Sequence, residues 1–229
     1  MDSKKPKEII LDLLAEKYSV KKAAFNNTQK VFEKIKKECQ RIASEYNKEL
    51  NTKGNAPLIQ FKDKGIYDAE FQMADDLLLF SLHSNVFNFD KSHNIWKSSY
   101  LHADPNASFC GIINIYNFLS DSLKFNRQND TGYLVARLYV NKDNHYFVEG
   151  KRQLGFLYND FINAVINDEC IRNIIESTIL FTLDFDLLVP EYNSVNTITV
   201  AQMNENLNSS KTQTAKRLGF KFNIDNNEI

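Results

Sequence analysis

The sequence predicts an α+β fold in which an antiparallel sheet is packed by helices on one face. Apolar residues recur at helical spacing up to residue 50 and at every second position after the breaker run NTKGNAP. The segment IYDAEFQM (66–73) alternates polar and apolar side chains, which indicates one wet and one covered face of a sheet. Only seven Gly and four Pro occur in 229 residues, and this scarcity favours long regular elements.

The first predicted element is a long helix over residues 5–50. An apolar stripe lies near its start, and a heptad seam follows over about three repeats. The stripe comprises Ile9, Ile10, Leu13, Leu14 and Tyr18, and the seam comprises Phe25, Thr28, Phe32, Ile35, Cys39, Ile42 and Tyr46. Two readings of the seam stay open, because it suits either a partner-binding or dimerising helix or a helix that docks on the chain's own sheet.

Three strands are expected next, as a meander of short connections. They are LIQFKD (58–63), IYDAEFQM (66–73) and LLLFSLHS (77–84). Residues 85–103 form an irregular crossover that ends at Asp104-Pro105, a helix start signal. Apolar residues at helical spacing then predict a second helix to about residue 125.

A hairpin and a closing helix complete the predicted order. The hairpin is YLVARLYV (133–140), the turn NKDN and HYFVEG (145–150), and the helix covers about 155–181. The order is therefore helix, three strands, helix, two strands, helix. We divide the chain into an N-terminal helical segment (1–50), an α+β domain (51–190) and a C-terminal extension (191–229) whose Asn-, Ser- and Lys-rich tail is expected to be flexible.

Charge and cysteine content exclude several classes of function. Lys plus Arg (28) nearly equals Asp plus Glu (29), which disfavours nucleic acid and anionic membranes as partners. The three cysteines are far apart and never in CxxC spacing, so we expect reduced, mostly buried thiols. The first residues do not read as a signal peptide, and no stretch has about 18 uninterrupted apolar residues, so we expect a cytoplasmic protein. The sequence contains no P-loop, GxGxxG, GxSxG or HExxH motif, and we expect neither a cofactor nor catalytic residues.

The segment HSNVFNFDKSHNIWKSSYLH (83–102) holds three of the four histidines and the only tryptophan. A metal site would use His83, Asp90 and His93. His102, Asp104 or His145 would complete it. Because the three histidines of this segment are ten and nine positions apart in irregular chain, they lack the short fixed spacing that metal ligands usually have. The favoured interpretation is a structured crossover anchored by Trp96, with an aromatic contact surface as the alternative.

Two other groups of residues are candidate binding sites. Arg127, Lys151 and Arg152 could hold an anion at the start of the last helix, although solvated caps explain them equally. The C-terminal run TAKRLGFKF mixes basic and aromatic residues and suits docking to a protein. The residues we nominate for partner contact are Phe25, Phe32, Trp96, Tyr100 and Phe220.

The element order resembles the α+β fold of type III secretion chaperones and a related bacterial family described as sensory-transduction regulators. The resemblance is carried by INIYNFLSDSLKFNRQNDTGYLVARLYVNKDNHYFVEG and the helix after it. It implies a protein-binding module without catalytic residues, often a homodimer. The functional prediction is therefore a non-enzymatic cytoplasmic interaction module. A metal-dependent or anion-processing enzyme centred on residues 83–102 and a small-ligand regulatory domain are the alternatives.

Overall fold

The computed structural model describes residues 5–54, 58–125, 127, 130–185, 191–201 and 203. The α-helices are α1 (Pro6–Thr52), α2 (Ser99–Ala103), α3 (Ser120–Lys124), α4 (Gln153–Leu157), α5 (Asp168–Leu183) and α6 (Tyr192–Val195). The strands are β1 (Gln60–Asp63), β2 (Asp68–Met73), β3 (Asp76–Leu82), β4 (Cys110–Leu119), β5 (Tyr133–Asn141) and β6 (Tyr146–Gly150). Two 3₁₀ turns, η1 (Asn94–Lys97) and η2 (Pro105–Ser108), lie in the crossover.

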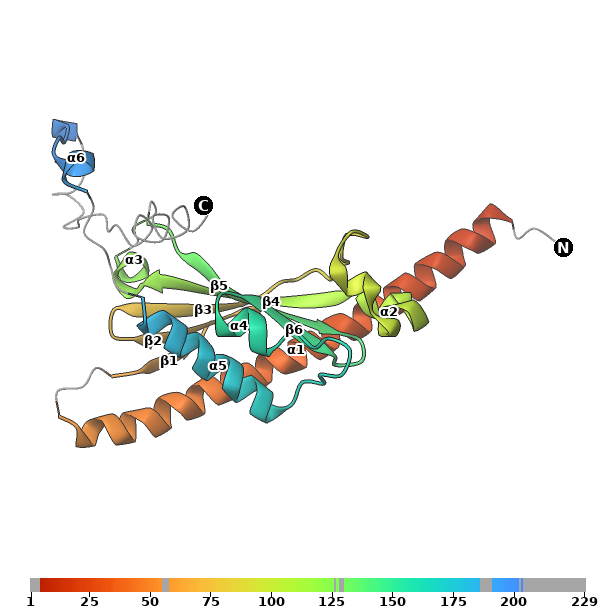
Figure 1. Cartoon of the computed structure of the whole chain (residues 1–229), viewed down its shortest axis with the longest axis horizontal. Helices are drawn as coiled ribbons and strands as arrows, with labels where there is room; N and C mark the ends of the chain where they lie inside the picture. Colours follow the sequence, from red (N-terminus) through yellow and green to blue (C-terminus); the bar gives the residue numbers. More distant parts are fainter. Residues whose placement is uncertain are drawn as a thin grey trace.

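The strands form one antiparallel sheet in the order β1-β2-β3-β4-β5-β6, so each strand pairs with its neighbours in the sequence. Helices α1 and α5 lie together on one face of this sheet (Figure 1). The α+β class, the antiparallel sheet, the long N-terminal helix, the first three strands and the hairpin are confirmed. The tail beyond residue 203 lies outside the described residues, and with it Phe220.

The main core lies between the sheet and these two helices. Alternate residues of each strand point into it, as the two-residue period of a strand requires. Its largest fully buried side chains include Phe32 and Ile35 of α1, Phe71 and Phe80 of the sheet, and Ile171 of α5. Gly111 of β4 lies so close to α1 that an added Cβ would be 2.2 Å from the Thr28 hydroxyl oxygen.

The predicted second helix is wrong, because residues 110–119 form the central strand β4. The Asp104-Pro105 signal starts only the 3₁₀ turn η2. Nearly every residue of CGIINIYNFL is apolar or aromatic, so helical spacing is found in it even though no helix forms. Three β-branched isoleucines favour the extended form, and β4 joins the meander to the hairpin in one sheet.

The predicted closing helix is interrupted between α4 and α5. Residues 158–167 instead run beside the edge strand β6, where the backbone N–H groups of Tyr146 and Val148 donate to the carbonyls of Ala164 and Tyr158. An exposed strand edge is thereby covered. Asn167 then starts α5, because its side-chain oxygen accepts from the Cys170 N–H at 2.8 Å.

Candidate functional site

The crossover from β3 to β4 is an ordered segment that packs on the sheet face opposite α1. Its side chains form a second apolar cluster with residues of β4, β5 and β6 that alternate with those of the main core. Trp96 anchors the segment, since its indole N–H donates to the Phe89 carbonyl at 3.3 Å. The Lys91 ammonium lies 3.4 Å from the centre of the Trp96 ring. The prediction of a structured crossover is confirmed, although it leads into a strand.

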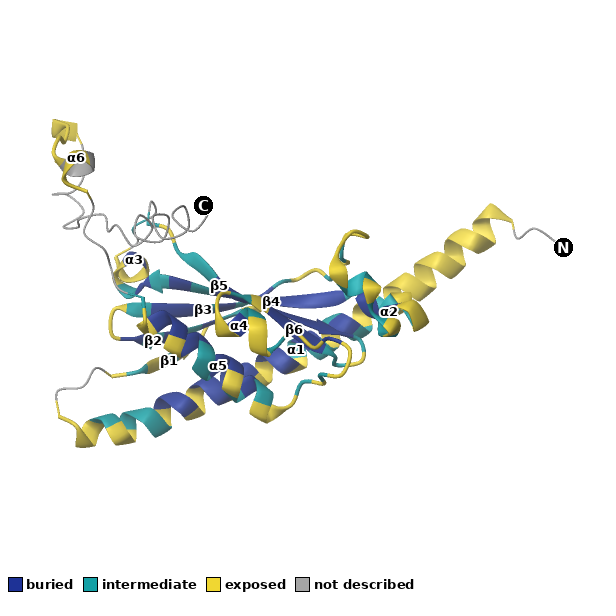
Figure 2. Cartoon of the chain, in the orientation of Figure 1, coloured by how far each residue is buried: buried dark blue, intermediate teal, exposed yellow. Residues whose placement is uncertain are grey.

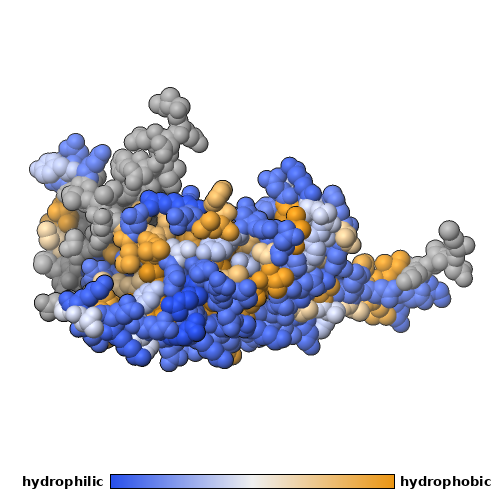
Figure 3. Space-filling model, turned by 60° about the horizontal axis from the view of Figure 1, so that its bottom comes forward, coloured by the Kyte–Doolittle hydropathy of each residue, from blue (hydrophilic) through white to orange (hydrophobic). Residues whose placement is uncertain are grey.

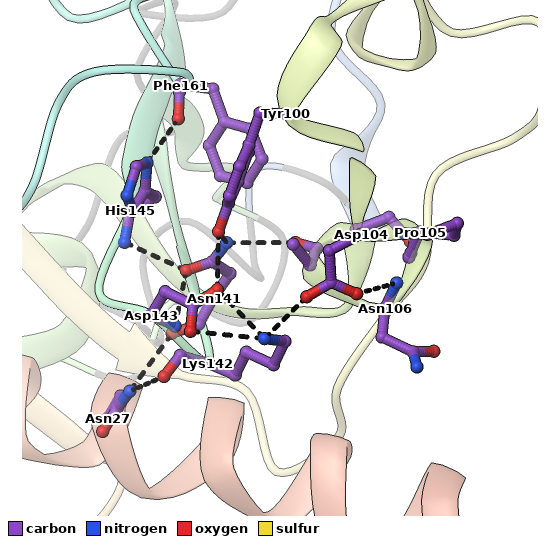
Figure 4. Close-up of polar contacts among 12 residues, drawn as sticks. Asn27, Tyr100, Asp104, Pro105, Asn106, Asn141, Lys142, Asp143, His145 and Phe161 are labelled. Atoms are coloured by element: carbon purple, nitrogen blue, oxygen red, sulfur yellow. Dashed lines mark hydrogen bonds and ion pairs between the residues drawn. The ribbon is translucent and has the colours of Figure 1, made fainter. Parts of the chain in front are cut away.

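Asn141, the last residue of β5, is the centre of a hydrogen-bond network that fixes the crossover to the hairpin turn (Figure 4). Its side-chain amide donates to the Tyr100 hydroxyl at 3.0 Å and to the Ala107 carbonyl at 3.1 Å. Its amide oxygen accepts from the backbone N–H groups of Asp143 and His145, both at 2.9 Å. Asn141 is fully buried, and these bonds remove the cost of burying its side chain.

The charged residues of this network also hold the hairpin turn against the crossover. The Tyr100 hydroxyl donates to the Asp143 carboxylate at 2.7 Å, and the Lys142 ammonium lies 2.8 Å from Asp104. Burial alone would raise the pKa of Asp143, but hydrogen bonds from Tyr100 and Lys142 outweigh it and hold that pKa below its usual value. Burial and the Asp143 carboxylate raise the pKa of Tyr100, which therefore stays a donor. Asn27 of α1 donates to the Lys142 carbonyl at 2.7 Å.

The residues of the metal hypothesis are close in sequence but do not converge. The Nδ1 of His83 accepts from the Asn85 N–H at 3.0 Å, while that of His93 accepts from the Ile95 N–H at 3.3 Å. Asp90 accepts from the hydroxyl and N–H of Ser92, and both bonds lower its pKa. Within the described ranges, no group of three or more His, Cys, Asp or Glu side chains could hold a metal ion. The metal set His83, Asp90 and His93 is therefore not supported.

A shallow groove of about 440 Å³ lies on the outer sheet face beside the crossover. It contains His83 and Asp90 at its edge and Arg137 on the sheet, with several apolar and aromatic side chains around them. The Arg137 guanidinium lies 3.4 Å from the Glu149 carboxylate, which also accepts from the Tyr139 hydroxyl at 2.9 Å. Burial and this carboxylate raise the pKa of Tyr139 to about 12. Arg137 is paired with Glu149 and Asp90 accepts hydrogen bonds from Ser92, so these charges are weakened as a means of selecting a ligand.

The predicted anion site is not assembled. Arg152 forms an ion pair with Asp184 and lies over the Phe181 ring, and Lys151 shares with it a hollow of about 310 Å³. Arg127 does not line this hollow and instead lies 3.6 Å from Asp130. Helix α4 is only five residues long, so its N-terminus offers little dipole for an anion.

The nominated partner contacts lie in very different surroundings. Phe32 is 0% exposed in the main core, so its side chain cannot reach a partner in this fold, and this nomination is corrected. Phe25, Trp96 and Tyr100 are partly buried, the last two in the crossover cluster. The heptad seam docks on the chain's own sheet over Thr28, Phe32, Ile35, Cys39 and Ile42, all buried.

The first part of α1 carries an exposed group of large apolar side chains. Every residue from 5 to 19 is exposed, and Ala24 is the first buried residue of the helix (Figure 2). We call residues 6–23 the free half of α1; it extends beyond the sheet by about 27 Å at 1.5 Å per residue. Six large apolar side chains on it are 44–67% exposed, namely Ile9, Ile10, Leu11, Leu13, Leu14 and Tyr18. Figure 3 shows hydrophobic residues exposed among hydrophilic ones on the projecting end.

The sequence contained the signal for this surface, since its apolar stripe covers the same residues. The periodicity could not show that the part of α1 before residue 24 extends past the edge of the sheet. Of the nominated partner contacts, Phe25 and Phe32 therefore fall on the later seam and none on the stripe. A projecting helix with such a stripe can bind another chain but has no groups arranged for chemistry. Contiguous exposed apolar surface of this kind is typical of interaction sites.

Comparison with known proteins adds no identification. No family model matches the sequence, no curated protein matches it, and no solved structure matches the fold. Among the helices of the described ranges, none has the length and apolar character needed to cross a bilayer. Function must therefore be argued from the surfaces themselves.

Proposed function

We propose that this chain is a non-enzymatic protein-interaction module that binds its partner through the free half of α1. The single observation that carries the proposal is the exposure of six large apolar side chains between Ile9 and Tyr18. A helical segment whose apolar face is not packed is marginal in water, because packing of such a face supplies most helix stability in proteins. A partner that covers this stripe would supply the missing packing.

The remaining conspicuous residues support the proposal because each has a structural partner. The histidine-rich crossover packs on the sheet, and its Tyr100 hydroxyl bonds to the hairpin turn. Its His83, Asp90 and His93 side chains accept hydrogen bonds from residues of the crossover itself. The buried thiols of Cys39 and Cys110 have their pKa raised by burial, which disfavours a reactive thiolate. The three cysteines are free, and we place the module in the cytoplasm on that ground.

The proposal keeps the chaperone-like or adaptor role implied by the resemblance described above. A chaperone-like module presents exposed apolar surface to a client chain, and the free half of α1 is such a surface. A homodimer is a separate part of this proposal, tested by the mass of the purified protein in solution.

A small-ligand regulatory domain is the second candidate, favoured by the groove of about 440 Å³ on the outer sheet face. This volume is within the range of ligand pockets, which is about 300–1,000 Å³. The groove is open and its one arginine pairs with Glu149, so we rank it below the helix surface. Binding of a metabolite that Arg137→Ala abolishes would move it to first place.

The test uses full-length protein returned to its native host and cross-linked there. The Ile10→Glu, Leu14→Glu double variant puts charge into the exposed stripe, whereas the Ser19→Glu control puts charge on the opposite side of the same free half. We expect a stoichiometric partner with the wild type and the control and its loss with the double variant. Equal recovery with all three proteins, or recovery of the chain alone from each, would overturn the proposal.

A further inference from the structure

We propose that the free half of α1 docks an amphipathic helix of another protein whose apolar stripe is flanked by acidic residues. The inference rests on the proposed function and specifies the chemistry of the partner. It is drawn from the arrangement of charge around the helix and from two occupants that this arrangement disfavours.

Acidic side chains of the free half gather on one side of the helix. Glu8, Asp12 and Glu16 follow one another at four-residue spacing, which places them along one line at 3.6 residues per turn. At about 100° per residue, this line is opposite the side that carries Ile10 and Leu14. The side chain of Glu16 also accepts from the Asn106 amide at 2.7 Å, which fixes that carboxylate toward the crossover.

Lysines gather at the two ends of the apolar stripe. Lys17 and Lys21 follow Ile10 and Leu14 on the same side of the helix, and Lys7 lies near the other end. The Lys21 ammonium lies 5.5 Å from the centre of the Phe109 ring, where the free half meets the rest of the fold. The stripe is therefore apolar in its middle and cationic at both ends, and complementary charge on a partner is acidic.

A second copy of the free half does not fit this pattern. In an antiparallel pair centred on Leu14, residues whose numbers sum to 28 lie level, so Lys7 faces the partner's Lys21. In a parallel pair Lys17 and Lys21 each face their own counterparts. Both arrangements oppose like charges at a close contact, which is destabilising.

An anionic lipid surface fits less well than an acidic helix. Interfacial helices that bind anionic lipids carry Lys and Arg on the polar face. Here the polar face carries Glu8, Asp12 and Glu16, whose carboxylates anionic headgroups would repel. A partner helix touches only the stripe and its lysine ends, so it avoids this repulsion.

The test measures binding of two labelled synthetic helices to the full chain by fluorescence anisotropy at low and high salt. Both peptides carry Leu at heptad positions a and d; one carries Glu and the other Lys at positions e and g. We expect the Glu peptide to bind the wild type about tenfold more tightly, from three ion pairs at the stripe ends, and the difference to shrink at high salt.

Three variants make the result specific. Lys7→Glu, Lys17→Glu, Lys21→Glu should reverse the preference toward the Lys peptide. The double variant Ile10→Glu, Leu14→Glu should abolish binding, and Ser19→Glu should leave it unchanged. Circular dichroism checks that each variant folds, which is expected because none of the substituted residues is buried.

Other outcomes count against the inference. Equal binding of the two peptides, preference of the wild type for the Lys peptide, or no binding of either overturns the acidic-partner chemistry. Tighter binding to phosphatidylserine vesicles than to the Glu peptide, or a dimer lost in the double variant, assigns the stripe to lipid or to a second copy. If cross-linking in the host still recovers a stripe-dependent partner, only this inference fails and the proposed function stands.

Discussion

The two halves of α1 carry the same kind of apolar stripe and have opposite surroundings. From Ala24 to Ala43 the stripe is buried against the sheet and α5, whereas from Ile9 to Tyr18 its residues face solvent. One continuous 47-residue helix connects them. The difference shows that helical periodicity identifies a face that must be covered and leaves open whether the cover belongs to the same chain.

The buried half is also fixed by charge. Arg172 of α5 contacts Glu38 and Glu45 of α1 at 3.2 and 2.8 Å, and its Nε lies 2.8 Å from Glu176. The hydrogen bond from the Arg172 guanidinium to Glu45 is the main cause that lowers the pKa of Glu45. The free half contacts the crossover through the hydrogen bond from the Asn106 amide to Glu16 and through Lys21, which lies over the Phe109 ring.

The largest expected effect is on the buried half. Phe32→Ala removes a fully buried ring from the core between α1 and the sheet, and we expect it to lower the free energy of unfolding by about 3–5 kcal/mol. Urea denaturation followed by circular dichroism measures the change. A loss below about 1 kcal/mol would mean that the seam is not docked on the sheet.

A second substitution tests how closely α1 approaches β4. Gly111→Ala would place a Cβ 2.2 Å from the Thr28 hydroxyl oxygen and 2.7 Å from its Cβ, so the helix or the strand must shift. We expect a loss of about 1–3 kcal/mol in urea denaturation, typical of overpacking. Unchanged stability would show that the helix and strand are farther apart than described.

The third prediction concerns the hairpin turn that Asn27 joins to α1. Tyr100→Phe removes the hydroxyl that donates to Asp143 and accepts from Asn141, and we expect a loss of about 1–2 kcal/mol at neutral pH. The folded pKa of Asp143 lies below its unfolded value of about 3.9. Its contribution is therefore present above that pH and is lost as pH falls through the folded pKa.

Denaturation of wild type and Tyr100→Phe as a function of pH measures this dependence. The stability difference should narrow as the pH falls below about 4, because Asp143 becomes protonated in both proteins. A difference that stays constant between neutral and acidic pH would show that the Tyr100 hydroxyl acts independently of the carboxylate.

The smallest expected effect is on the free half. Leu14→Ala removes a side chain that is 62% exposed, so we expect a change within about 0.5 kcal/mol in the same urea measurement. Alanine also favours the helix at least as well as leucine. A loss comparable with that of Phe32→Ala would show that Leu14 is buried by its own chain and would remove the contrast between the halves.

Local pattern was sufficient for most elements of the fold. The alternation from Asp68 to Met73 predicted a strand with one covered face, and the burial of Ala69, Phe71 and Met73 confirms it. The run from Cys110 to Leu119 misled because a central strand apolar along most of its length fits helical spacing too. The pairing of β4 with β3 and β5 depends on residues far apart in the sequence, so the pattern within residues 110–119 alone could not predict it.

For the exposed stripe of α1, too, the sequence predicted the apolar pattern but not its surroundings. The stripe from Ile9 to Tyr18 was visible in the sequence, but its exposure depends on where the sheet ends. The histidine segment is conspicuous by its composition, although His83 and His93 accept backbone hydrogen bonds within it and Tyr100 bonds to Asn141. Which polar residues serve the fold could be decided only from their partners in space.

Amide hydrogen exchange along α1 of the purified full-length protein tests the central claim most directly. We predict that amides of the buried half, from Thr28 to Ile42, exchange at least about a hundredfold more slowly than those from Ile9 to Ser19. Exchange in the buried half requires the core to open, whereas exchange in the free half requires only local fraying of the helix. Equal protection of the two halves would contradict the account, since it would mean that the isolated chain already covers the stripe assigned to a partner.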